Sequence, residues 1–189
     1  MFLVWDPNGV HAPYLEGAVR DRRVERVDAV ARIGRERSRR DPPGDPEPHR
    51  HGTPGKRSRG ALRAGQIMSA PVVTLPPSAT LDAATTLIRE RRFRHVPIRS
   101  PHGRIVGVIS DRDLLRHGDR HRHEPISAVM ATPVLTAAPE TELRDVARVL
   151  LAERIGSMPI VEAGELRGIL TRTDILRAVV HHGALDLFA

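Results

Sequence analysis

Two ten-residue segments of the chain carry a hydroxyl and a carboxylate at the same spacing. Residues 107–116 read GVISDRDLLR, and residues 168–177 read GILTRTDILR. In both, a glycine and two aliphatic residues precede Ser or Thr, and Asp follows three residues later. Residues three apart lie on the same face of a helix, so the two groups would be neighbours there. The pairs are Ser110 with Asp113 and Thr171 with Asp174.

This spacing is compatible with two kinds of chemistry. In the first, the hydroxyl caps a helix and the carboxylate reaches back to complete a capping box, although Glu or Gln is the usual partner. In the second, the carboxylate accepts hydrogen bonds from the vicinal hydroxyls of a ribose, and nearby N–H groups face a sugar or phosphate oxygen. The preceding glycine would let a ligand or a neighbouring backbone approach closely. The residues alone leave both interpretations open.

The twin segments belong to a longer internal repeat. Residues 67–116 match residues 129–177, with an offset of 62 that becomes 61 near His102. Each copy predicts a strand, a helix, two strands and a second helix, and the first strands are expected at residues 71–75 and 133–137. Thr80 is the predicted N-cap of the first helix. The inward helix faces are predicted to hold Leu81, Ala84, Thr85 and Ile88 in one copy and Leu143, Val146, Ala147 and Leu150 in the other.

The repeat determines the expected fold class. Half of it, about fifty residues, would bury too little apolar surface to be stable alone. Two copies that pack their sheets together would remove this difficulty, and a unit found only twice indicates a tandem pair rather than a solenoid. The expected fold is therefore α/β (α+β), with two tandem repeats packed as a pseudo-symmetric pair.

Composition limits the class of protein. The 189 residues are 40% hydrophobic but only 3% aromatic, so the core must be aliphatic, and the absence of cysteine excludes disulfides and thiolate metal sites. The net charge of +7 is divided between residues 1–60 (+4) and the remainder (+3), which weakens the case for a dedicated nucleic-acid surface. No apolar run approaches the length of a signal-peptide core or a membrane span. We expect a cytoplasmic protein without a membrane partner.

The first sixty residues differ from the repeats in composition and in hydrophobic pattern. Two apolar runs flank Asn8-Gly9, a strong hairpin signal, and would carry Trp5 and Tyr14. The arginine-rich stretch that follows predicts either a weak amphipathic helix or an extended segment. Pro, Gly and charged residues dominate residues 38–60, as in a disordered linker. The predicted units are a 1–37 extension, a 38–60 linker, a first repeat at 61–118 and a second at 124–182.

In this order, the segments IMS…PV.T, VPI and GVISDRD resemble the CBS domain, named after cystathionine β-synthase. The two copies together resemble a CBS pair, or Bateman module, over residues 64–180, and nothing in the resemblance covers residues 1–60. Family members of this kind bind adenosine-containing ligands such as AMP, ADP, ATP or S-adenosylmethionine between the repeats. They act as sensors rather than catalysts. The resemblance implies a stand-alone regulatory module that forms a homodimer and binds ribose through Asp113 and Asp174, next to Ser110 and Thr171.

The resemblance also implies which residues contact the rest of such a ligand. The phosphate would meet Arg94 and His95, assigned to the ligand held by Asp174, with Arg112 and Arg172 as secondary candidates. That assignment makes the cleft of Asp174 the preferred nucleotide site; alternatively, Arg94 is a solvated arginine. The adenine would lie on side chains that any core of this fold would also contain: Val72, Val73, Val96 and Ile98 in one repeat, and Val134, Leu135, Met158 and Ile160 in the other.

No other constellation predicts catalysis or metal binding. His117, His121 and His123 gather between the repeats, but no cysteine or metal-ligand spacing accompanies them, so we interpret them as a solvated connector. The sequence has no nucleophile paired with a base, no GxGxxG and no Walker loop. We therefore expect neither an enzyme nor a cofactor.

Two alternative functions stay open. An interaction or scaffold protein would act through residues 1–60 on a regulated partner that the sequence does not identify. Nucleic-acid binding through the arginines between Arg20 and Arg59 is disfavoured, because no aromatic stacking platform accompanies them.

Overall fold

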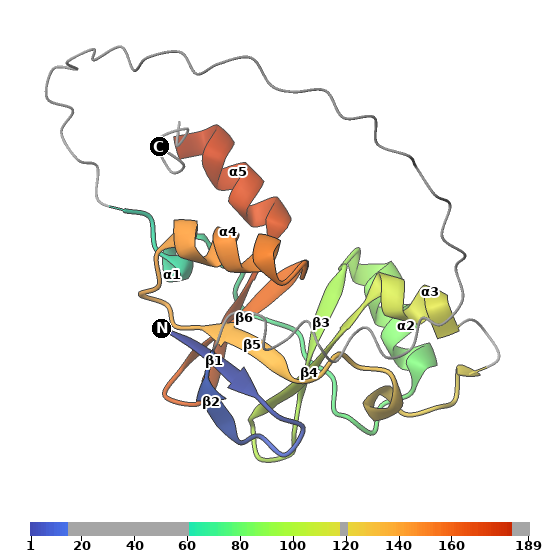
Figure 1. The fold of residues 1–189 in the computed structure, drawn as a ribbon. Helices are drawn as coiled ribbons and strands as arrows, with labels where there is room; N and C mark the ends of the chain where they lie inside the picture. The colour runs from blue at the N-terminus through green and yellow to red at the C-terminus, as the bar shows by residue number, and fades with distance from the viewer. Residues whose placement is uncertain (15–60, 118–120, 183–189) are drawn as a thin grey trace, which may run out of the picture.

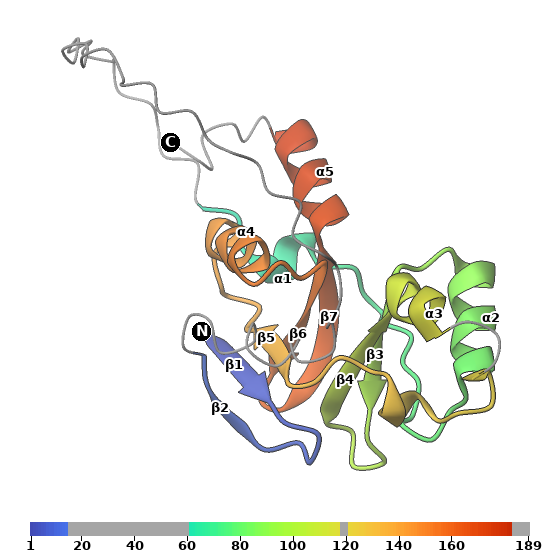
Figure 2. The same cartoon turned by 45° about the vertical axis from the view of Figure 1, so that its right-hand side comes forward.

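The fold is described from a computed structural model, which covers residues 1–14, 61–117 and 121–182. Two sequence predictions lie outside these ranges: the weak helix or extended segment after residue 18, and the linker at 38–60. The described chain forms two lobes side by side, each with a sheet covered by helices (Figures 1 and 2). The expected tandem α/β pair is confirmed. Within the described ranges, every helix is too short or too polar to span a bilayer.

Lobe 1 is built mainly from the first repeat. Its two-stranded antiparallel sheet pairs β3 (His95–Arg99) with β4 (Ile105–Ser110). The helices α2 (Leu81–Arg91) and α3 (Asp111–His117) pack beside this sheet (Figure 2). A single 3₁₀ turn, η2 (Ile126–Ala128), comes from the start of the second repeat.

Lobe 2 has a larger, five-stranded sheet in the order β2-β1-β5-β6-β7. Its helices are α1 (Ala64–Ile67), α4 (Leu143–Ala152) and α5 (Arg172–His182). Its strands are β1 (Phe2–Trp5), β2 (His11–Pro13), β5 (Val134–Ala137), β6 (Ser157–Glu162) and β7 (Glu165–Thr171).

The predicted first strand forms in the second repeat but not in the first. Residues 134–137 form β5, whereas the equivalent residues of the first repeat make only one parallel bridge, between Leu75 and Ile98. Two prolines, Pro76 and Pro77, follow Leu75 and have no N–H with which to extend a ladder. β5 is also held on both edges, by β1 and by β6. The strand predicted at 71–75 is therefore wrong beyond this single bridge.

The first helices form where the pattern predicts them. The Thr80 hydroxyl accepts a hydrogen bond from the Ala83 N–H at 3.1 Å, as expected of an N-cap. Seven of the eight predicted inward-facing side chains are buried; Thr85 is half-buried and donates its hydroxyl to the Leu81 carbonyl. The apolar stripes therefore attach α2 and α4 to separate cores, one in each lobe.

The leading segment of each repeat crosses to the opposite lobe. The side chains of Ala64 and Met68 pack in the core of lobe 2, and those of Ile126 and Met130 pack in the core of lobe 1. Backbone bridges from Ser69 to Ile169 and from Ala131 to Val108 fix both crossings. The compact lobes thus differ from the contiguous units 61–118 and 124–182, because each contains the start of the other repeat.

A hairpin at the N-terminus completes the larger sheet. β1 and β2 flank a turn in which the Asp6 carboxylate accepts from the N–H groups of Asn8 and Val10, and Gly9 has a φ of 76°. β1 then pairs antiparallel with β5 along its whole length. Residues from the start of the chain therefore lie against a strand 129 to 135 positions later (Figure 1).

Candidate functional site

The two hydroxyl and carboxylate pairs have nearly the same geometry. Asp113 Oδ2 accepts from the Ser110 hydroxyl at 2.5 Å and from the Ser110 N–H at 3.0 Å, and the Asp113 N–H donates to Ser110 Oγ at 3.3 Å. In the second repeat the corresponding distances for Thr171 and Asp174 are 2.7, 2.9 and 3.3 Å. Each pair is a reciprocal capping box at the junction of a strand and a helix. The capping interpretation is correct for both copies.

Capping uses only one oxygen of each carboxylate. Asp174 directs Oδ1 at Arg177, with an ion-pair distance of 3.5 Å to Nη1. Arg116 stands at the equivalent position in the first repeat, but no hydrogen bond or ion pair within the described ranges joins it to Asp113. Asp113 is only 8% exposed. Its Oδ1 is therefore the acceptor that the fold leaves open.

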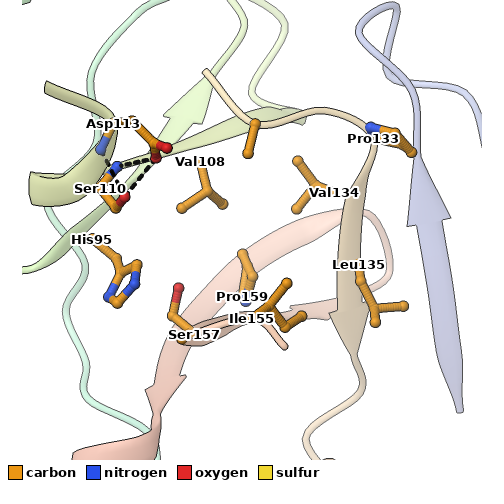
Figure 3. Close-up of a pocket in the computed structure, with 12 residues that line it drawn as sticks. His95, Val108, Ser110, Asp113, Pro133, Val134, Leu135, Ile155, Ser157 and Pro159 are labelled. Atoms are coloured by element: carbon orange, nitrogen blue, oxygen red, sulfur yellow. Dashed lines mark hydrogen bonds between the residues drawn. The ribbon is translucent and has the colours of Figure 1, made fainter. Parts of the chain in front are cut away.

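Asp113 lies in a pocket between the two lobes (Figure 3). Lobe 1 contributes the cap residues, the His95 imidazole and the Val108 side chain, and lobe 2 contributes a mostly apolar wall. The complete lining is His95, Val108, Ser110, Asp113, Ala131, Pro133, Val134, Leu135, Ile155, Gly156, Ser157 and Pro159. The volume of about 60 Å³ suits a few water molecules. A larger ligand would require movement of the lining side chains or of the lobes.

The structure places His95 in the wall of the Asp113 pocket, although the sequence assigns it to the ligand of Asp174. His95 opens β3 and pairs in register with Ser110 on β4, so the strand pairing sets it next to the cap of its own repeat. Its ring also lies against Gly156, where an added Cβ would come within 2.5 Å of His95 Nε2. His95 therefore stands where the two lobes meet.

The three predicted phosphate-binding arginines are all exposed but do not line this pocket. The Arg94 carbonyl accepts from the Asp111 N–H at the start of α3. Arg172 donates its Nε–H to the carbonyl of Ile155, a residue of the pocket wall, at 3.0 Å. Arg112 directly precedes Asp113 on the first turn of α3. Of these, Arg172 is the one attached to the wall of the Asp113 pocket.

Only two of the eight side chains predicted for the adenine surface line the pocket, namely Val134 and Leu135. Four others have no exposed surface and belong to the lobe cores: Val96, Ile98, Met158 and Ile160. Val72 is half-buried and Val73 is 40% exposed, and neither lines this pocket. These six residues do not line this pocket, and their assignment to an adenine surface stays a prediction.

Strand alternation explains why Met158 and Ile160 do not line this pocket. Successive side chains of a strand point to opposite faces, so Met158 and Ile160 enter the core while Ser157 and Pro159 face the pocket. Ser157 and Pro159 are thus pocket residues that are absent from the predicted ligand set. The period of two in SMPIV would have identified both.

The histidines between the repeats do not form a metal site in the described ranges. The His117 ring nitrogen Nδ1 lies 2.9 Å from the Asp113 carbonyl, and His121 Nδ1 lies 2.6 Å from Glu124 Oε1. Across residues 1–14, 61–117 and 121–182, no group of three or more His, Asp or Glu side chains has an arrangement that could hold a metal ion.

Known proteins share this arrangement. The model of the CBS domain matches residues 64–119 and 126–181. The chain is 28% identical to the AcuB protein of Vibrio cholerae, with a TM-score of 0.60 over 68% of this chain and 98% of that one. It is 29% identical to CBSX2, solved in complex with AMP, with a TM-score of 0.57 over 64% and 98% of the two chains.

A third relative is much longer than this chain. The A-adding tRNA nucleotidyltransferase of Aquifex aeolicus is 30% identical over 124 residues, which cover 66% of this chain but only 15% of the enzyme. The shared region is thus a small part of that protein. Two matched domains, the crossing of the lobes and the twin caps establish that this chain belongs to the CBS domain family, as a tandem pair of CBS domains.

Proposed function

We propose that this protein is a regulatory sensor that binds an adenosine-containing nucleotide in the Asp113 pocket. The observation that carries the proposal is that Asp113 lines the pocket between the lobes, where one carboxylate oxygen caps α3 and the other has no hydrogen bond within the described ranges. A related CBS pair, CBSX2, was solved with AMP. The protein would regulate through ligand occupancy and would not catalyse a reaction.

The pocket offers suitable chemistry for a nucleoside. A desolvated carboxylate can accept hydrogen bonds from the 2′- and 3′-hydroxyls of ribose, and Ser110 and Ser157 add small polar groups nearby. The base would lie on the apolar wall that includes Val134 and Leu135. For the phosphate we propose His95 and Arg172, since both contact the backbone at residues 155–156 from opposite lobes.

The second cleft is proposed as the weaker site. Asp174 keeps its cap, but its remaining oxygen is paired with Arg177, so a ribose would have to compete with that guanidinium. The family resemblance implies instead that this cleft is preferred, because it assigns Arg94 and His95 to the ligand of Asp174. The pairing of His95 with Ser110 instead favours the cleft of Asp113.

Isothermal titration calorimetry of the full chain against AMP, ADP, ATP and S-adenosylmethionine tests the proposal. We expect saturable binding of at least one adenine nucleotide at one high-affinity site. S-adenosylmethionine carries no phosphate, so a nucleotide preference of tenfold or more would agree with the proposed cations. No heat from any of the four with folded protein would reject the sensor and leave the twin segments as helix caps.

We further propose that the protein forms a homodimer through α3 and α5. Leu115 and Leu176 occupy equivalent positions in the two repeats and are 82% and 65% exposed; Val180, one turn after Leu176, is 77% exposed. Apolar side chains at equivalent places on two helices mark an interaction surface, and a second copy offers the same pair by two-fold symmetry.

A charge in this surface should separate the subunits. We expect Leu176→Glu to weaken dimerisation about tenfold or more in analytical ultracentrifugation, because burying an unpaired carboxylate is costly. Thr86→Glu, at an exposed position of α2, is the matched control. A dimer that tolerates Leu176→Glu as well as Thr86→Glu would exclude α5 from the interface.

A further inference from the structure

The N-terminal hairpin contributes side chains to two separate cores. Because β1 alternates, Phe2 and Val4 pack against the core of lobe 2, while Leu3 and Trp5 pack on the opposite face of the sheet. This hairpin lies outside the two matched CBS domains. It is therefore a feature of this chain that the family assignment does not explain.

Trp5 lies where the two lobes meet. The side chain is 3% exposed and clusters with Ile105 of lobe 1 and with Val134 and Val161 of lobe 2. Its indole N–H donates to the Thr136 hydroxyl at 3.1 Å, and that hydroxyl donates to the Leu3 carbonyl at 3.2 Å. An aromatic side chain buried in this way attaches the hairpin to both lobes.

The turn of the hairpin adds a second attachment to lobe 1. Arg104, directly before β4, donates an Nη1–H to the Gly9 carbonyl at 3.2 Å. Its aliphatic stem also lies close to Gly9, where an added Cβ would come within 3.1 Å of Arg104 Cδ. The hairpin is thus hydrogen-bonded to lobe 2 along β5 and to lobe 1 at its turn.

The Trp5 cluster and the candidate ligand pocket share two walls. Val108 packs against this cluster and Val134 belongs to it, and both residues also line the pocket with Asp113. Val134 is in addition the register partner of Trp5 between β1 and β5. Any change in the packing of Trp5 therefore acts directly on both sides of the pocket.

We propose that Trp5 is a positioning residue for the ligand pocket. The hairpin is then the fixed contact, or hinge point, about which the two lobes move apart when a ligand enters. This inference rests on the proposed nucleotide site. The pocket of about 60 Å³ must widen to admit a nucleotide. The Trp5 cluster behind Val108 and Val134 limits how the two lobes can be oriented relative to each other in the open form. Fewer orientations mean a smaller entropic cost of binding.

The test compares two variants of the same strand. Trp5→Ala removes the side chain that packs on both lobes, whereas Phe2→Ala weakens the docking of the hairpin on lobe 2 alone. By calorimetry with AMP, we expect Trp5→Ala to lower the affinity about five- to tenfold and Phe2→Ala to change it less than twofold. Circular dichroism melts establish that both are folded; if Trp5→Ala is not, Thr136→Val removes the indole's acceptor without opening the cluster.

Hydrogen exchange supplies a readout that a purely stabilising role would not move. Val108 packs against the Trp5 cluster and exchanges backbone hydrogen bonds with Ala131 beside the pocket, so the N–H groups of both should exchange faster in Trp5→Ala than in a Phe2→Ala protein of equal melting temperature. Binding of AMP should slow exchange in β1, because coupling between two sites is reciprocal.

The two proposals fail in distinguishable ways. If the unmodified chain does not bind AMP or another adenine nucleotide, the nucleotide site itself is wrong. If the unmodified chain binds an adenine nucleotide and Trp5→Ala or Thr136→Val binds it equally well or more tightly, the nucleotide site is supported and the hinge-point role of the hairpin is wrong. Equal exchange of Val108 and Ala131 in the two matched variants would also overturn it.

Discussion

Asp113→Asn is expected to weaken binding of an adenine nucleotide about 10- to 150-fold, which corresponds to about 1.5–3 kcal/mol for a hydrogen bond to a charged group. The amide has nearly the shape of the carboxylate, and its oxygen can still accept from the Ser110 N–H and hydroxyl. What the substitution removes is the negative charge and the second acceptor oxygen, which an NH2 donor replaces. The affinity for AMP is measured by calorimetry on the full chain.

Asp174→Asn is the matched control for this prediction. It alters the equivalent cap by the same chemistry, but the oxygen that it neutralises faces Arg177 and not the described pocket. We expect a change of less than threefold at the high-affinity site, and a similar loss of stability in urea for both variants. A larger loss of affinity for Asp174→Asn than for Asp113→Asn would return the preferred site to the second cleft.

The sequence was sufficient for the architecture because the information for it is local and repeated. Helical spacing of apolar residues, the Thr80 cap and the S/T-x-x-D pairs each depend on residues at most a few positions apart. Their recurrence at offsets of 62 and 61 made a coincidence implausible. The double family match at 64–119 and 126–181 agrees with this repeat.

The features that sequence reasoning missed depend on long-range contacts. Nothing in the run before Trp5 indicates that it pairs with residues 134–137, because an antiparallel partner can lie anywhere in the chain. The pairing of His95 with Ser110 likewise follows from the register of two strands, which sets the imidazole beside the cap of Asp113. The alternation within SMPIV, in contrast, is local information, and it indicates that Ser157 and Pro159 face the pocket.

Each glycine of the twin segments packs against a methionine side chain. The sequence suggested that Gly107 and Gly168 admit a ligand or a neighbouring backbone. Instead, a methionine side chain from the leading segment of the opposite repeat lies on each: Met130 on Gly107 and Met68 on Gly168. The same close approach is therefore used for packing, and it joins each crossing segment to the lobe that receives it.

Gly168→Ala is accordingly expected to destabilise the protein by about 1–3 kcal/mol, the usual cost of overpacking a filled core. An added Cβ would stand 2.3 Å from Met68 Sδ and 2.7 Å from its Cγ, so the whole side chain must move. Without this clash the change would be neutral or slightly stabilising, because alanine restricts the unfolded chain more than glycine. The free energy of unfolding is measured by urea denaturation.

A double-mutant cycle identifies which methionine opposes the new methyl group. Shortening Met68 to Ala removes the clashing atoms, so Gly168→Ala with Met68→Ala should be more stable than the sum of the single changes by about 1 kcal/mol or more. Met130→Ala is the matched control, since Met130 lies on Gly107 in the other lobe and should show no coupling to Gly168. Coupling to Met130 instead would mean that each leading segment packs on its own repeat. Coupling to Met68 alone requires the crossed arrangement. In that arrangement neither lobe is complete without the first residues of the other repeat. A ligand bound in the pocket between the lobes therefore acts on both repeats.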